Sequence, residues 1–173
     1  MSSCKKHLCC AGTQRPAASH CAGKVMGVEA DSGLLNALLN VQNIEHLYNQ
    51  PWVGYSWEGF VIEQILACLG LFGLNAEPYF FRTSDGIEAD LLLDWAGQRW
   101  AIEIKLTSNP TKSMIKGLQK AAKLVGASKQ IIICKTAEEI RSDSLLVTNL
   151  PSFLNELVQT KHQNHGAHAK PRR

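Results

Sequence analysis

The sequence has no long apolar run, no glycine-rich phosphate loop and no acidic residue near either end. No uninterrupted apolar stretch approaches the roughly 18 residues that a helix needs to cross a bilayer. Lys5 and Lys6 are not followed by the apolar segment of a secretory signal. We therefore expect a cytoplasmic protein without a membrane partner. The missing pattern GxxxxGK(S/T) binds nucleotide phosphates through its backbone amides, so this chain is not itself an ATPase.

Zinc-binding spacings are also absent among the six cysteines. Four cysteines fall within the first 21 residues at spacings that match no common zinc motif, and Cys68 and Cys134 lie in apolar stretches. Without a secretory signal we expect reduced thiols, with Cys68 and Cys134 in the core. Residues 1–23 show no periodicity and are predicted to be disordered; a zinc site there remains an alternative, using Cys4, His7, Cys9, Cys10, His20 or Cys21.

The acidic residues are all in the middle of the chain. Residues 1–24 and residues 161–173 each carry four basic residues and no acid, within a net charge of +3 for the whole chain. Residues 25–160 therefore have a charge of −5. An acidic body is not typical of a protein that binds nucleic acid by electrostatics alone, which weighs against a nuclease.

Periodicity predicts one α/β domain over residues 24–159, followed by a disordered basic tail over residues 160–173. A content of 45% apolar and 19% charged residues is that of a soluble globular protein. Strands are recognised by β-branched and alternating residues, and helices by apolar stripes and capping residues. The expected helices cover 33–39, 43–48, 55–69, 111–125 and 151–158, and the expected strands cover 78–83, 88–95, 99–106, 129–134 and 145–148.

The stretch EADLLLDWAGQRWAIEIKL, residues 88–106, is predicted to form a hairpin with a turn at 96–98. Side chains alternate along a strand, so Asp90 lies on one face of the first strand, and Glu103 and Lys105 share a face of the second. Two carboxylates and an ammonium on buried strands are costly to desolvate unless they pair or bind something. The hairpin is therefore the candidate site.

Asp90 followed by Glu103-Ile104-Lys105 resembles the PD-(D/E)XK nuclease-like superfamily. Four separated motifs resemble, in order, an uncharacterised carboxy-terminal domain found behind the AAA+ module of bacterial and archaeal ATPases: DSGLL (31–35), GYSWEGF (54–60), RTSDG (82–86) and AIEIK (101–105). The resemblance implies a restriction-endonuclease-like core of order α-β-β-β-α-β, with a mixed central sheet flanked by helices. It also implies that Glu58 completes the acidic cluster. The ATPase module is not part of this sequence, so we expect a stand-alone or truncated domain whose partner is a separately encoded AAA+ ATPase.

These residues suggest hydrolysis of DNA phosphodiesters with Mg²⁺. Asp90 and Glu103 are the expected metal ligands, and Lys105 is positioned to stabilise the transition state. Three lysines of the following helix, Lys112, Lys116 and Lys120, together with Lys123, form a stripe suited to DNA phosphates or simply to solvent.

The alternative is a structural ion network. Glu103 and Lys105 would neutralise each other, with Asp90 as the third member. The domain would then be a non-catalytic accessory or partner-binding module with a vestigial acidic cluster.

Overall fold

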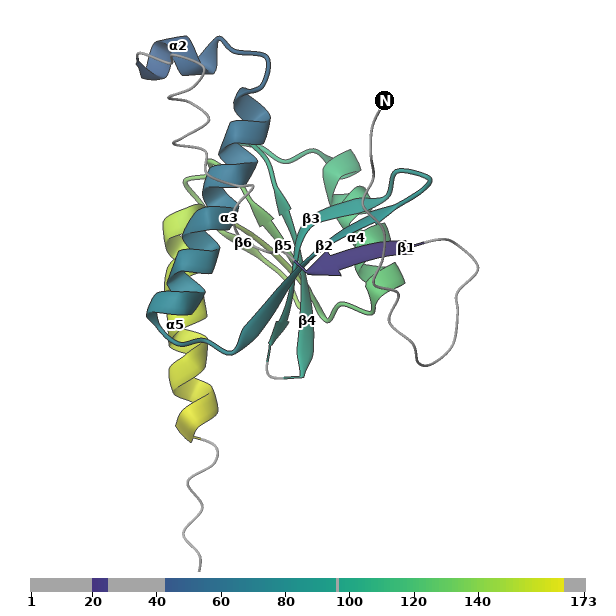
Figure 1. The fold of residues 1–173 in the computed structure, drawn as a ribbon, viewed down its shortest axis with the longest axis vertical. Helices are drawn as coiled ribbons and strands as arrows, with labels where there is room; N and C mark the ends of the chain where they lie inside the picture. The colour runs from purple at the N-terminus through teal and green to yellow at the C-terminus, as the bar shows by residue number, and fades with distance from the viewer. Residues whose placement is uncertain (1–19, 25–42, 96, 167–173) are drawn as a thin grey trace, which may run out of the picture.

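The computed structural model describes residues 20–24, 43–95 and 97–166, which form one mixed sheet flanked by helices (Figure 1). Within these residues the sheet has seven strands in the order β1-β2-β3-β4-β5-β7-β6. The strands are β1 (His20–Lys24), β2 (Ala76–Thr83), β3 (Glu88–Trp95), β4 (Gln98–Ile104), β5 (Lys129–Ile133), β6 (Ile140–Arg141) and β7 (Leu145–Thr148). The helices are α2 (Ile44–Tyr48), α3 (Val53–Leu71), α4 (Lys112–Val125) and α5 (Leu150–Gly166).

Strand β4 lies at the centre of this sheet. It pairs antiparallel with β3 and parallel with β5, which pairs parallel with β7. Parallel neighbours need a crossover, and α4 supplies it between β4 and β5. The predicted α/β class and the element order α-β-β-β-α-β, from α3 to β5, are both present.

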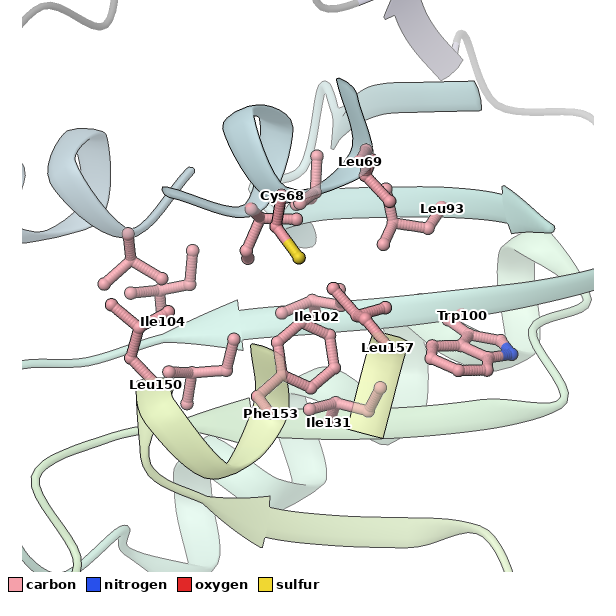
Figure 2. Close-up of a cluster of buried hydrophobic side chains, with 14 of the residues drawn as sticks. Cys68, Leu69, Leu93, Trp100, Ile102, Ile104, Ile131, Leu150, Phe153 and Leu157 are labelled. Atoms are coloured by element: carbon pink, nitrogen blue, oxygen red, sulfur yellow. The ribbon is translucent and has the colours of Figure 1, made fainter. Parts of the chain in front are cut away.

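Helices cover both faces of the central strands. Figure 2 shows Cys68 of α3 and Phe153 and Leu157 of α5 packed over the side chains of the sheet. The opposite face is covered by α4, whose Leu118, Ala121 and Ala122 pack against Leu92, Ala101, Ile132 and Val147. Strands β3 and β4 are therefore buried on both faces. Cys68 and Cys134 are buried free thiols, as predicted.

Three segments differ from the sequence-based expectations. Residues 20–23 were expected to be disordered but belong to β1, which pairs with β2 along the sheet edge. This strand is defined by its backbone pairing, and the sequence HCAGK has no alternation of apolar and polar residues that would predict it. Helix α5 continues to Gly166 through the start of the predicted disordered tail, since helix propagation does not require an apolar stripe. Ile140 and Arg141 form β6 where a connection was expected.

The predicted helix over 33–39, residues 1–19 and residues 167–173 lie outside the described residues.

The spacing of apolar residues predicts that one stripe of α3 faces the core and includes Val61, Ile65 and Leu69 together with Phe60 and Phe72. The first three are buried, but Phe60 and Phe72 are exposed. Apolar residues occur all round this helix, so the sequence does not indicate which face meets the sheet. Even so, no helix within the described ranges is both long and apolar enough to cross a membrane.

Phe153 gives a direct test of how α5 is held to the sheet. Its side chain is fully buried, so Phe153→Ala should lower the free energy of unfolding by about 3–5 kcal/mol through lost burial and a new cavity. Urea unfolding measures the loss. Leu71 is 81% exposed, so Leu71→Ala should change stability by less than about 0.5 kcal/mol. Equal losses in the two variants would contradict this packing.

Candidate active site at the end of the central strands

The β3–β4 hairpin sets the faces on which the charged residues lie. Its turn contains Gly97 with a φ of 76°, a conformation that glycine adopts without strain. Leu91 pairs with Ile102, and one residue further along the same register Asp90 lies opposite Glu103. Oδ2 of Asp90 accepts a hydrogen bond of 2.7 Å from the backbone N–H of Ile104, the residue after Glu103. Asp90 is thereby fixed beside the end of β4.

Lys105 joins three carboxylates at this end of the sheet. Its backbone N–H donates to the carbonyl of Ile133 at 3.0 Å, which continues the β4–β5 pairing. Its Nζ lies 3.0 Å from Oε1 of Glu58, 3.1 Å from Oε1 of Glu103 and 3.4 Å from Oδ2 of Asp90. The structure thus brings together all four side chains that the sequence and the resemblance selected.

Each of the four side chains keeps some access to solvent. Glu58 is held by α3, whose Val61 and Ile65 pack into the core one and two turns further on. The side chains of Lys105 and Glu58 are 26% and 24% exposed, and those of Asp90 and Glu103 are 13% and 12% exposed. The cluster is therefore recessed but open to a ligand.

Burial and crowding shift the titration of the acids. The pKa of Glu103 is raised to about 7, chiefly by burial and then by the negative charge of Asp90, while Lys105 opposes the shift. Burial also raises the pKa values of Glu58 and Asp90, although the Ile104 N–H and Lys105 partly oppose the shift at Asp90. One ammonium does not fully compensate three buried carboxylates.

Lys105 responds in the opposite sense. Burial alone would lower the pKa of its ammonium, but Asp90, Glu103 and Glu58 together raise the pKa above its usual value. Lys105 is therefore a permanent cation here, suited to hydrogen-bond donation and not to taking a proton.

The lysine stripe lies on the exposed face of α4, on the helix that follows the site. Lys112, Lys116, Lys120 and Lys123 are all exposed. Lys112 begins the helix, after a cap in which Thr111 accepts from the N–H of Met114. At 1.5 Å per residue the stripe extends roughly 16 Å along the helix. Lys112 is therefore nearest in sequence to Lys105, and Lys123 is farthest.

Several polar contacts near the hairpin were not expected. Arg99 forms a bidentate pair with Asp94, with both distances 2.6 Å, and donates to the carbonyl of Val125. This contact anchors the turn end of the hairpin to α4. At the site end, Nζ of Lys135 lies 4.9 Å from the ring centroid of Tyr48. No pattern in the sequence links Tyr48 to Lys135, because the two residues are far apart along the chain. Tyr55 could have been noted from the sequence, since it lies one helical turn before Glu58.

The arrangement offers two carboxylates to a metal ion. Within the part of the chain that the structure describes, no three His, Cys, Asp or Glu side chains are grouped so that they could hold one together. Both hydrogen bonds to Asp90 use Oδ2, so Oδ1 is the oxygen left to face an ion. A hard cation such as Mg²⁺ is commonly held by one or two carboxylates, with water and substrate phosphate as its other ligands. Asp90 and Glu103 fit that description.

Glu103→Gln should stabilise the metal-free protein at neutral pH and above. The pKa of Glu103 is about 7 when folded and 4.5 in its ordinary state, so the folded chain holds this proton more tightly. The resulting cost is absent below about pH 4.5, grows as the pH rises, and is complete above about pH 7. The variant should gain on the order of 3 kcal/mol at pH 8 and little at pH 4.5. Urea titrations with a chelator measure this, with the exposed Glu138→Gln as control; a gain that does not depend on pH would contradict it.

Comparison with known proteins identifies the family. Residues 53–153 match the model described as "Domain of unknown function (DUF4143)". Uncharacterized protein Mb2031c of Mycobacterium bovis and Uncharacterized protein Rv2008c of Mycobacterium tuberculosis are each 34% identical to this chain over 136 residues. The alignment covers 75% of this chain but 30% of each relative, so the chain spans less than a third of the length of these curated relatives. The matched region is more than half of the sequence and includes all four clustered residues, and the chain therefore belongs to the DUF4143 domain family.

Proposed function

We propose that this domain hydrolyses DNA phosphodiester bonds with Mg²⁺, through Glu58, Asp90, Glu103 and Lys105. The observation that carries the proposal is the position of the Lys105 ammonium, 3.0–3.4 Å from three carboxylates that come from α3, β3 and the end of β4. Such a cluster is recessed without being sealed, and it combines acidic ligands with a fixed cation. Phosphodiester hydrolysis needs both kinds of group.

The arrangement of elements supports a restriction-endonuclease-like core. Helix α3 is followed by β2, β3, β4, α4 and β5, the order that the PD-(D/E)XK resemblance implies. The acidic residue of the hairpin and the Glu-Ile-Lys segment lie on adjacent central strands. Glu58, the position that the resemblance assigned to the first helix, contacts the same lysine.

The donor set suits a hard divalent cation. Asp90 and Glu103 would hold the ion, which supplies charge neutralisation at the phosphate and makes a bound water more acidic. Burial raises the pKa values of both carboxyl groups, and repulsion by the Asp90 carboxylate adds to the shift at Glu103. A cation between them relieves that repulsion.

Lys105 and Glu58 have complementary roles in this proposal. The Lys105 ammonium donates to a phosphate oxygen as negative charge develops in the transition state. Glu58 holds the ammonium in place through its contact of 3.0 Å. Lys112, Lys116 and Lys120 lie on the exposed face of the next helix, where they can contact further DNA phosphates.

A second function is favoured by a different feature of the fold. An apolar groove of about 730 Å³ between α3 and α5 is lined by Leu71, Phe72, Leu154 and Val158. The chain spans only 30% of its curated relatives, and the resembled domain occurs behind AAA+ modules. In this reading the domain is an accessory module that binds a separately encoded AAA+ ATPase, and the four charged residues are a structural ion network.

Metal binding is the first experiment that distinguishes the nuclease from the accessory module. Mg²⁺ or Mn²⁺ at about ten times its dissociation constant should stabilise the fold by about 1.4 kcal/mol, a rise in Tm of a few degrees. Asp90→Asn retains an acceptor for the Ile104 N–H but loses the ligand charge, so it should fold and lose the shift. Differential scanning fluorimetry measures both, with Glu138→Gln as a variant that keeps the shift. No shift at millimolar metal, or an equal shift in Asp90→Asn, would support the ion network.

DNA cleavage is the second experiment that distinguishes the nuclease from the accessory module. Lys105→Ala should slow metal-dependent DNA cleavage by roughly 10²-fold or more, because a transition-state donor is lost, while the metal-induced rise in Tm persists. Lys105→Gln, which still has a donor for the carboxylates, should be equally inactive and guards against a folding defect. Gel assays with single-stranded and duplex DNA measure the rate.

Lysines outside the cluster provide the matched control for this assay. Lys116→Ala and Lys120→Ala should weaken binding to every DNA sequence and reduce its salt dependence, without abolishing cleavage at saturating DNA. If the parent protein cuts neither form of DNA with Mg²⁺ or Mn²⁺, the accessory module is the better account.

A further inference from the structure

We infer that the substrate of this site is a single-stranded nucleic acid whose bases stack on Tyr48 and Tyr55, with Lys135 beside them on the backbone. The inference rests on the proposed function and specifies its substrate class. It depends on the residues that surround the four-residue cluster, none of which takes part in the chemistry proposed above.

Tyr48 and Lys135 are tied to the end of the sheet that carries Lys105. The backbone N–H of Lys105 donates to Ile133 at 3.0 Å, and the backbone N–H of Lys135 donates to the carbonyl of Thr107 at 2.7 Å. The segments after β4 and β5 therefore leave the sheet side by side. The Lys135 ammonium then lies 4.9 Å from the centre of the Tyr48 ring. A cation and an aromatic ring thus stand together close to the site.

Tyr55 lies on α3, the helix that carries Glu58. It precedes Glu58 by three residues, so the two side chains lie on neighbouring positions of one helix face. Glu58 contacts Lys105 directly, whereas the Tyr55 side chain is 77% exposed. Tyr48 is 49% exposed. Two large aromatic side chains are therefore open to solvent near a recessed acidic cluster.

Exposed aromatic rings favour unpaired bases. In a duplex the base faces are stacked on one another, while in a single strand each face is free to stack on a side chain. Stacking also supplies affinity that does not depend on net charge. Duplex binding depends mainly on several phosphate contacts, and residues 25–160 have a charge of −5. An acidic body with a few local cations and exposed rings therefore suits a single strand better.

The depth of the site points the same way. The four clustered side chains are at most 26% exposed, so a reacting phosphate has to reach groups that are largely buried. A single strand bends readily and can place one phosphate there, while its neighbouring bases reach Tyr48 and Tyr55. Lys135 beside one ring can pair with an adjacent phosphate.

The test uses fluorescence anisotropy of the full chain with labelled oligo(dT), oligo(U) and a mixed-sequence DNA duplex of equal length, with Ca²⁺ replacing Mg²⁺. One or both single strands should bind at least about tenfold more tightly than the duplex, and comparison of oligo(dT) with oligo(U) tells DNA from RNA. Tyr55→Ala should weaken single-strand binding roughly five- to a hundredfold, whereas Tyr55→Phe, which retains the ring, should stay within about twofold. Phe72→Ala, which removes an exposed ring at the far end of α3, is the matched control and should have no effect.

The outcomes distinguish this inference from the function on which it rests. Tighter binding of the duplex, or no loss in Tyr55→Ala, overturns the single-strand assignment even where Lys105-dependent cleavage is found. Tyr55-dependent single-strand binding without any cleavage supports this surface and removes the nuclease. Absence of oligonucleotide binding overturns the inference and leaves the tyrosines as a contact surface for another protein.

Discussion

The contact of one ammonium with three carboxylates determines how the elements at this end of the sheet are assembled. Lys105 follows the central strand, Glu103 lies within it, Asp90 comes from the neighbouring strand and Glu58 from the helix above. Bringing three acids together out of water is unfavourable unless a cation meets them, and removal of that cation would leave their charges uncompensated and strongly destabilise the fold. The ammonium can occupy this place because the backbone of Lys105 is held by Ile133 of β5. The position of the site therefore depends on the parallel pairing of β4 with β5.

That pairing is stable because β4 is buried on both faces. Trp100, Ile102 and Ile104 face α3 and α5, and Ala101 faces α4. Glu103 shares the α4-side face with Ala101, at the point where the apolar cover ends and the charged cluster begins. The small side chain of Ala101 lets α4 pack closely, and Arg99 with Asp94 fixes the other end of the hairpin to the same helix. The strand is thus held at both ends, and the charged residues lie on a rigid support of the kind that a precise site requires.

The features that the sequence could predict are those governed by local periodicity. Alternation along a strand places Asp90, Glu103 and Lys105 without any knowledge of the fold, and Thr111 and Gly126 mark both ends of α4. Glu58 could be assigned only through the family resemblance, because nothing in α3 itself separates it from Glu63. Strand β1 and the contact between Tyr48 and Lys135 could not be predicted, since both arise from tertiary pairing. Phe60 and Phe72 were misplaced because a helix that is apolar all round does not specify its buried face.

The charge balance of the cluster bears on the choice between a site and a structural ion network. An ion network that serves stability alone is most favourable when its charges cancel. Here three carboxylates contact one ammonium, so the ionised cluster would carry two uncompensated negative charges. The imbalance appears in the titration: the pKa of Glu103 rises to about 7, because burial and Asp90 outweigh Lys105. An apolar residue in place of Glu103 would avoid this cost, as buried ion pairs often permit. Such a loss of stability, which the fold itself does not require, is typical of functional sites, where acids with shifted pKa values bind a ligand. A divalent cation is the simplest ligand that would cancel both excess charges, and this is the physical argument for the proposed metal site over an ion network that serves stability alone.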